Sequence, residues 1–262
     1  MFLDHFNFNA HPFAENPPIR FILRDARMEE ALEGLKHFLE YERLTLIIGQ
    51  TGIGKSTLFK LFKHDLPQNR YNPVYIHLSA VNAKSFLRLF ITRLGEKPKI
   101  GKERLFLQIE DRIRKNDKCT LLMVDEAHLL DPETLTDLRV LTSSIEEELS
   151  LKIILCGQES ISQTLKRSSH TDFVNRIFVK FMFKPLSRDQ TIAYVDNRIS
   201  CAGGTNKIFE TESKELIHDY TGGIPRLINN VSTACLLNAV SKNQKKISES
   251  LVNQTMSEFH LP

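Results

Sequence analysis

The chain has 262 residues and a formal net charge of +3, with 41% hydrophobic and 26% charged residues. This composition is ordinary for a globular protein and leaves little room for extended disorder. No apolar run approaches the roughly 20 residues of a membrane span, and the N-terminus lacks the basic-then-apolar pattern of a signal peptide. The four cysteines are scattered singly, without the paired spacing of a zinc site or a disulfide framework. We therefore expect a cytoplasmic protein without a membrane span.

Residues 1–24 are predicted to form an arm that folds back on the core. The arm holds Phe2, Phe6, Phe8 and Phe13 together with three prolines. So many prolines exclude a long helix, and so many aromatic residues argue against a free tail.

Strands and helices alternate from residue 25 to residue 185. The apolar spacing predicts helices at 25–41, 57–65, 83–94 and 103–115 and a further one starting near 132. Buried strands are predicted at 44–48, 73–78, 120–124 and 151–156. This alternation is typical of a parallel sheet with helices on both faces, so residues 25–185 are predicted to form an α/β domain.

The pattern changes after Pro185. Four helices, at 188–201, 211–220, 225–240 and 248–259, follow one another with no strand between them. Residues 186–262 are therefore predicted to form a small helical lid domain.

A complete P-loop motif lies between the strand at 44–48 and the helix at 57–65. Glycines let the backbone N–H groups wrap a phosphate, and the following helix presents its positive end to the same charge. Lys55 is expected to reach the β- and γ-phosphates of ATP, and Ser56 to bind Mg²⁺. The residues predicted to bind the cofactor are Gly49, Gln50, Thr51, Gly52, Ile53, Gly54, Lys55, Ser56 and Thr57.

Two adjacent carboxylates end the strand at 120–124. In a parallel sheet this is the edge at which ligands bind. Asp125 is expected to hold the Mg²⁺ shell, and Glu126 to orient the water that attacks the γ-phosphate. The alternative is that the pair only caps the helix that follows at Asp131 to Glu133.

Three further polar residues follow the two main motifs in the chain. Gln158 follows the strand at 151–156, and the alternative for it is a solvated loop residue. Arg176 precedes an extended apolar segment, where a neighbouring subunit's phosphate would meet it; otherwise it is a surface charge. Arg226 opens a helix after a Gly-Gly-Ile-Pro turn, and its alternative is a plain helix start.

The whole order of motifs resembles the AAA+ ATPases of the ExeA/GspA type and their transposon-borne TniB/TnsC-type relatives. The resemblance covers nearly the whole chain, and two segments point to this branch: the aromatic and proline-rich opening at 6–13 and the Gly-Ile-Pro-Arg turn at 223–226. The resemblance implies that Gln158 is the first sensor, that Arg176 is an arginine finger acting on an adjacent subunit, and that Arg226 is the second sensor. Arg167 is the alternative finger.

Secretion-type members of this family are longer, with a membrane span and a cell-wall-binding portion after the ATPase. The transposon-type members resemble this sequence better in length, and they are similar to ring- or filament-forming ATPases that bind DNA. We therefore expect a homo-oligomer that hydrolyses ATP, assembles on double-stranded DNA and selects the target for a transposase, with a target-site adaptor protein as a further partner. The alternative is an assembly ATPase of a type II secretion or pilus system. A non-hydrolysing scaffold is disfavoured because Glu126 is present.

One segment concentrates positive charge. Residues 83–104 hold seven bases and two acids. In similar DNA-coating members the equivalent surface lines a central channel, which predicts phosphate contacts rather than base contacts. The predicted DNA-binding residues are Lys84, Arg88, Lys97, Lys99, Lys102 and Arg104, with the loop between the two helices exposed. The alternative is a solvated helix face.

Overall fold

The computed structural model describes residues 2–144, 151–167 and 170–259. The chain divides into two compact units. The sheet unit comprises Glu29–Thr51 and Leu58–Phe183, and the helical unit comprises Met1–Met28, Gly52–Thr57 and Lys184–Pro262.

The sheet unit is built on five parallel strands in the order β2-β3-β4-β1-β5. The strands are β1 (Leu44–Ile48), β2 (Tyr71–His77), β3 (Cys119–Asp125), β4 (Leu151–Gly157) and β5 (Lys180–Met182). The first, third and fourth are buried along their whole length, as expected for a sheet covered on both faces. Because all strands run in one direction, the residues that follow β1, β3 and β4 emerge at the same edge.

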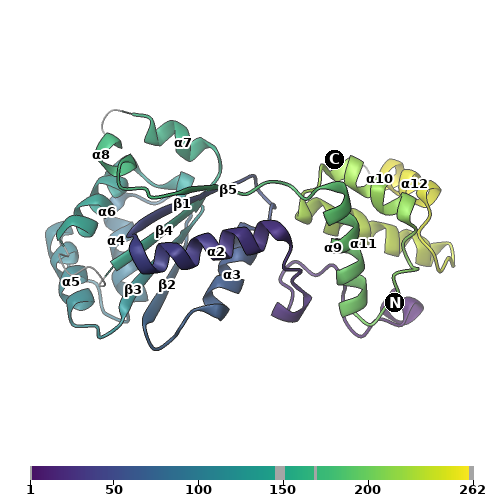
Figure 1. The fold of residues 1–262 in the computed structure, drawn as a ribbon, viewed down its shortest axis with the longest axis horizontal. Helices are drawn as coiled ribbons and strands as arrows, with labels where there is room; N and C mark the ends of the chain where they lie inside the picture. Colours follow the sequence, from purple (N-terminus) through teal and green to yellow (C-terminus); the bar gives the residue numbers. More distant parts are fainter. Residues whose placement is uncertain (1, 145–150, 168–169, 260–262) are drawn as a thin grey trace. The chain divides into compact units, whose positions relative to one another are not determined.

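Helices cover both faces of this sheet (Figure 1). In chain order they are α2 (Ala26–Tyr41), α3 (Lys55–Asp65), α4 (Ala83–Arg93), α5 (Lys102–Arg114), η2 (Ala127–Leu129), α6 (Pro132–Ser144), α7 (Ser160–Leu165) and α8 (Thr171–Val174). α2 and α3 lie on one face, where Phe59 of α3 meets the ring of Tyr75 edge-on. α4, α5 and α6 lie on the other face.

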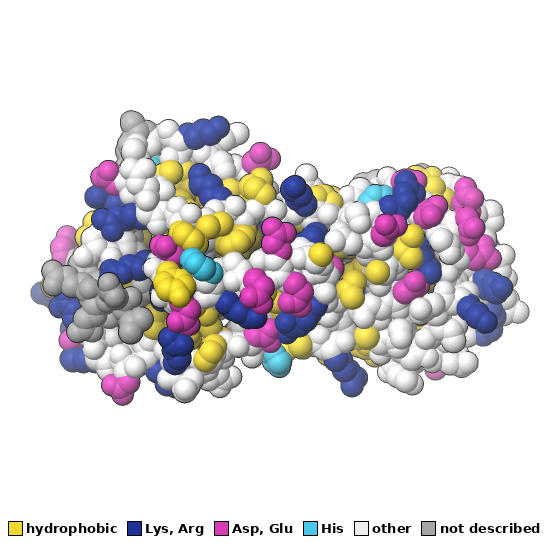
Figure 2. Space-filling model, viewed as in Figure 1, with side chains coloured by type: hydrophobic (Ala, Val, Ile, Leu, Met, Phe, Trp, Pro, Cys, Tyr) yellow, Lys and Arg dark blue, Asp and Glu magenta, His cyan; other side chains and the backbone are white. Residues whose placement is uncertain are grey.

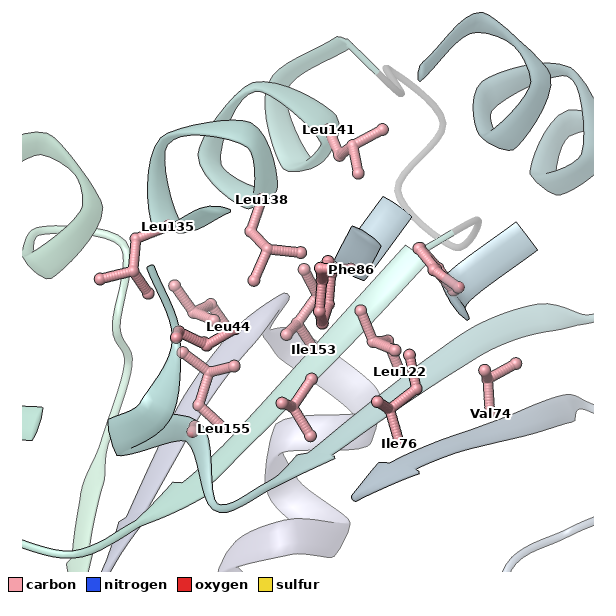
Figure 3. Close-up of a cluster of buried hydrophobic side chains, with 14 of the residues drawn as sticks. Leu44, Val74, Ile76, Phe86, Leu122, Leu135, Leu138, Leu141, Ile153 and Leu155 are labelled. Atoms are coloured by element: carbon pink, nitrogen blue, oxygen red, sulfur yellow. The ribbon is translucent and has the colours of Figure 1, made fainter. Parts of the chain in front are cut away.

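The larger hydrophobic core lies between the sheet and the second group of helices. Leu122 and Ile153 of the central strands face Phe86 of α4 and Leu138 of α6 (Figure 3). Burial of this aliphatic and aromatic surface provides most of the free energy that holds the strands in register. The register in turn places the site residues at the sheet edge.

The helical unit contains α9 (Arg188–Cys201), α10 (Thr211–Thr221), α11 (Pro225–Ser241) and α12 (Glu249–Phe259). The N-terminal segment joins it through α1 (Phe2–Phe6) and η1 (Ile19–Phe21), with Phe6, Phe8, Phe13 and Phe21 in the core of the helices.

A buried arginine fastens the N-terminal segment to α9. The Arg198 guanidinium donates to the carbonyl oxygens of Pro12 (2.5 Å) and Ala14 (2.7 Å). These hydrogen bonds satisfy a desolvated charge and fix the backbone just before Glu15.

None of the helices in the described residues is long and apolar enough to cross a membrane. All four cysteines are free thiols, three of them buried and Cys201 half-buried.

Candidate nucleotide site

The P-loop connects β1 to α3. Gly52 (φ +78°) and Gly54 (φ +108°) adopt backbone conformations that disfavour any side chain, which explains the glycines of the motif. The loop starts at the sheet edge, where the Gly49 N–H donates to the Gly157 carbonyl oxygen at the end of β4 (3.1 Å). Lys55 is the first residue of α3 and is buried.

The turn before α11 packs directly on this loop. The Arg226 N–H donates to the Gly52 carbonyl oxygen (3.2 Å). A Cβ at Gly52 would lie 2.7 Å from Arg226 Cβ and 3.3 Å from a methyl of Ile224. Gly52 is therefore required both for its positive φ and for the close approach of the Gly-Ile-Pro-Arg turn. The Arg226 side chain is half-exposed and lies 3.6 Å from the Glu15 carboxylate.

Asp125 ends β3 and is fully buried. Its Oδ1 accepts from the Glu126 N–H (2.9 Å), and its Oδ2 accepts from the Tyr75 hydroxyl (2.9 Å). The His77 Nδ1 lies 3.7 Å from the same Oδ2. Burial and the negative Asp125 raise the pKa of Tyr75, so its hydroxyl stays protonated and continues to donate to Asp125. These contacts orient the carboxylate from two sides.

Tyr75 and His77 were not among the predicted site residues. Both come from β2, which pairs in parallel with β3 so that His77 is the register partner of Asp125. Neither residue belongs to a recognisable sequence motif. The signal that would have found them is the pairing of the second and third strands, which the sequence alone does not establish.

Glu126 has a left-handed backbone (φ 58°, ψ 35°), which is uncommon for a residue with a side chain. Such conformations persist where the surrounding structure enforces them, and they cluster at functional sites. The Glu126 carboxylate lies 3.4 Å from the His128 Nδ1. At the start of α6 the Asp131 side chain accepts from the Glu133 N–H (3.0 Å), so this helix has a capping residue of its own.

Gln158 directly follows β4, at the same sheet edge as Asp125. Its backbone N–H approaches the His128 Nδ1 at 3.5 Å. The structure thus brings the Glu126 carboxylate and the Gln158 backbone N–H to the same ring nitrogen of one histidine.

Arg176 lies at the opposite edge of the sheet. It follows α8, two residues before Phe178, whose N–H donates to the carbonyl oxygen of Leu44 at the start of β1 (3.1 Å). Its side chain is exposed and lines an open depression of about 510 Å³ together with Tyr41, Arg43 and Phe178. The alternative finger, Arg167, is also exposed and follows α7.

The predicted DNA-binding residues divide into two groups. Five of them are exposed: Lys84, Arg88, Lys97, Lys99 and Arg104. Lys102 differs, because it begins α5 and pairs with Glu133 (2.5 Å) and Asp137 (2.9 Å) of α6. The helix predicted at 103–115 begins one residue earlier, so Lys102 belongs to α5 and not to the exposed loop.

The residues present fit Mg²⁺ delivered with a nucleotide. In the described part of the chain, no group of three or more His, Cys, Asp or Glu side chains is arranged to hold a metal. Mg²⁺ is commonly held by one or two carboxylates together with substrate phosphates. Ser56 and Asp125 supply oxygen donors of the required kind.

The parallel sheet, the P-loop and the C-terminal helices define a P-loop AAA+ fold, and the predicted fold class is confirmed. Residues 37–165 match the family model of the AAA domain.

Among curated proteins, the chain is similar to General secretion pathway protein A of Aeromonas hydrophila, with 29% identity over 254 residues. The match covers 94% of this chain and 46% of that protein, so the chain spans about half the length of this relative. The predicted resemblance to the secretion-type branch is thereby supported, whereas closeness to the transposon-type branch stays a prediction.

Solved structures share the fold at low sequence identity. Cdc6p from Pyrobaculum aerophilum has a TM-score of 0.74 and 17% identity, covering 94% of this chain and 70% of that one. The Aeropyrum pernix ORC1 protein in complex with DNA has a TM-score of 0.72 and 15% identity, covering 96% of this chain and 70% of that one. The RuvB Holliday junction branch migration motor of Thermotoga maritima has a TM-score of 0.60 and 16% identity, covering 88% of this chain and 67% of that one.

Proposed function

We propose that this protein is an AAA+ ATPase that binds ATP with Mg²⁺ and hydrolyses it at the boundary between two subunits. The P-loop N–H groups and Lys55 bind the phosphates, and Ser56 and the Asp125 carboxylate would hold Mg²⁺, which would neutralise charge on them. Glu126 orients and polarises the attacking water. Gln158 senses the γ-phosphate, and Arg226 contacts it from the start of α11.

The position of Arg176 is the observation that supports a site formed by two neighbouring subunits. β1 separates Arg176 from the edge where Gly49 and Asp125 lie, and five residues of strand span about 16 Å. This separation exceeds the length of an arginine side chain, so Arg176 does not serve the site at the opposite edge of its own sheet. An arginine finger supplied by a neighbouring subunit meets this constraint.

The surroundings of Arg176 are suited to a protein contact. Tyr41 is 74% exposed and Phe178 is 42% exposed, and the Phe178 ring stacks on His37. Figure 2 shows exposed hydrophobic side chains beside a histidine on the face of the molecule that carries α2. Aromatic residues and arginine are enriched in protein interfaces.

Mixing two inactive variants tests the shared site. Lys55→Ala removes the P-loop cation and abolishes ATP binding, whereas Arg176→Ala binds ATP but hydrolyses it poorly. In a mixture, a wild-type Arg176 faces an intact P-loop at some boundaries, so we expect partial recovery of ATPase activity. Repeating the mixture with Arg167→Ala in place of Arg176→Ala shows which of the two arginines is the finger. No recovery at any mixing ratio would contradict action between subunits.

Duplex DNA is the partner that we propose first, with a transposase and a target-site adaptor acting on the assembled complex. The support is the set of exposed cations on α4, on α5 and in the loop at 94–101. Lys97 and Lys99 are exposed in this loop, so their charges are accessible to phosphates. The ORC1 structure, similar in fold, was solved in complex with DNA. A cytoplasmic location is consistent with this role.

A secretion system is the second candidate partner. The observation that favours it is the 29% identity to General secretion pathway protein A over nearly the whole chain. In this case the nucleotide-driven assembly acts on protein components of a type II secretion or pilus system. The dependence of DNA binding on salt, considered below, separates the two candidates.

A further inference from the structure

His128 is the side chain that lies between Glu126 and Gln158. It is the middle residue of η2, the short turn that follows β3, and its side chain is only 12% exposed. Its Nδ1 lies 3.4 Å from the Glu126 Oε2 and 3.5 Å from the Gln158 backbone nitrogen.

The backbone around His128 allows little movement. The Leu129 N–H donates to the Glu126 carbonyl oxygen (2.9 Å), which closes the turn. Gly157, at the end of β4, approaches so closely that a Cβ there would lie 3.0 Å from the His128 nitrogen. The imidazole is therefore held on a rigid support between the ends of β3 and β4.

One nitrogen of this imidazole has two competing partners. A neutral imidazole carries its proton on one ring nitrogen, and the other nitrogen is an acceptor. With the proton on Nδ1, His128 donates to the Glu126 carboxylate; with the proton on Nε2, Nδ1 accepts from the Gln158 N–H. Nδ1 does not make both hydrogen bonds at once, so the two contacts exclude each other.

We propose that His128 is a positioning residue for Glu126, and that it links the orientation of this carboxylate to the backbone at Gln158. When Nδ1 donates to the carboxylate, it fixes the orientation of Glu126; when it accepts from the Gln158 N–H, as in the hydrogen bond at 3.5 Å, the carboxylate is released. The inference rests on the proposed role of Glu126 in orienting the attacking water. His128 itself does not contact the substrate in this scheme.

Two substitutions of nearly equal chemistry test the proposal. His128→Asn places an amide near the former Nδ1, whereas His128→Gln places it near the former Nε2. We expect His128→Asn to keep most of the single-turnover rate of ATP hydrolysis and His128→Gln to lower it by about ten-fold or more, as for other side chains that orient a reacting group. Both variants should bind a fluorescent ATP analogue within about two-fold of wild type, because the phosphates contact the P-loop rather than His128.

A double-substitution cycle separates positioning from a structural role. In the Glu126→Gln background, adding His128→Gln should leave the residual rate unchanged, because no carboxylate remains to be oriented. A wild-type rate for His128→Gln, equal losses in both histidine variants, or the same loss in both backgrounds would each overturn the proposal. Failure of the underlying function is distinguishable, because Glu126→Gln alone would then hydrolyse ATP at the wild-type rate.

Discussion

At the scale of single residues, Glu126 combines a left-handed backbone with a carboxylate that faces a histidine. This conformation costs free energy, of order 1–3 kcal/mol for a residue of this kind, and surrounding contacts must maintain it. The close packing of Gly157 on the turn at His128 is one such contact.

We predict that Glu126→Gln retains ATP binding and slows hydrolysis by orders of magnitude. The amide has nearly the shape of the carboxylate but lacks the charge that polarises the water, while Asp125 still supports Mg²⁺. Steady-state phosphate release and ATP-analogue affinity measure the two effects. Turnover near the wild-type rate would show that another residue activates the water.

A second prediction concerns the ion pair between Arg226 and Glu15. The N-terminal segment is fixed at Pro12 and Ala14 by Arg198, which places the Glu15 carboxylate beside Arg226. An ATP γ-phosphate competes for the same guanidinium. Because exposed ion pairs contribute at most about 1 kcal/mol, Glu15→Gln should tighten ATP binding by no more than about five-fold.

The control for this prediction is Glu212→Gln, which removes the same charge from an exposed site in the first turn of α10. It should leave ATP affinity unchanged. Glu15→Gln should also have no effect in the Arg226→Ala background, and an equal effect there would contradict competition for Arg226.

At the scale of elements, two neighbouring glycines end α10 and start the turn that leads to Arg226. Both have positive φ, +56° at Gly222 and +74° at Gly223. A Cβ at Gly222 meets nothing within 4 Å, whereas a Cβ at Gly223 would lie 2.0 Å from the Leu186 carbonyl oxygen. The Leu186 N–H also donates to the Gly223 carbonyl oxygen (2.9 Å), so the two backbones are held together.

We predict that Gly222→Ala lowers the free energy of unfolding by about 1–2 kcal/mol, the cost of a left-handed conformation with a side chain. Gly223→Ala should cost about 1–3 kcal/mol more, because the Leu186 backbone must move. Urea unfolding monitored by circular dichroism measures both. Equal losses of stability would show that the clash at Leu186 is relieved without cost.

At the scale of the whole molecule, the distribution of positive charge separates the two candidate partners. Gln108 holds the loop between α4 and α5 in one shape by accepting from the Lys99 N–H (3.1 Å) and donating to the Lys97 carbonyl oxygen (3.0 Å). Lys97 and Lys99 are exposed on this loop. Lys102 is already neutralised by Glu133 and Asp137.

We predict that Lys97→Glu with Lys99→Glu leaves ATP binding intact and weakens binding to duplex DNA of any sequence. The slope of log affinity against log salt should flatten by roughly one unit for each lost phosphate contact. DNA affinity is measured with ATP at several salt concentrations. The matched control, Lys207→Glu with Lys246→Glu, makes the same charge change at exposed lysines of the helical unit.

The result decides between the partners. A flattened slope in the loop variant but not in the control supports DNA as the partner. Equal slopes in wild type and loop variant would make the basic segment a solvated face and favour the secretion candidate.

The sequence alone determined the features that depend on neighbouring residues. Continuous apolar runs located the strands β1 and β4, and apolar spacing located the helix α9, to within one residue of each observed boundary. The P-loop and the Asp125-Glu126 pair could be predicted because each motif consists of residues that are adjacent in the sequence. The parallel sheet followed from the alternation of elements.

Only the tertiary structure decided which distant residues meet. The register of β2 on β3 sets Tyr75 and His77 beside Asp125, and the packing of α5 on α6 removes Lys102 from the free cations. The turn at Glu126 places His128 against Gln158, thirty residues further along the chain. Strand register and helix packing are determined by the summed burial of many side chains, and no local pattern specifies that sum.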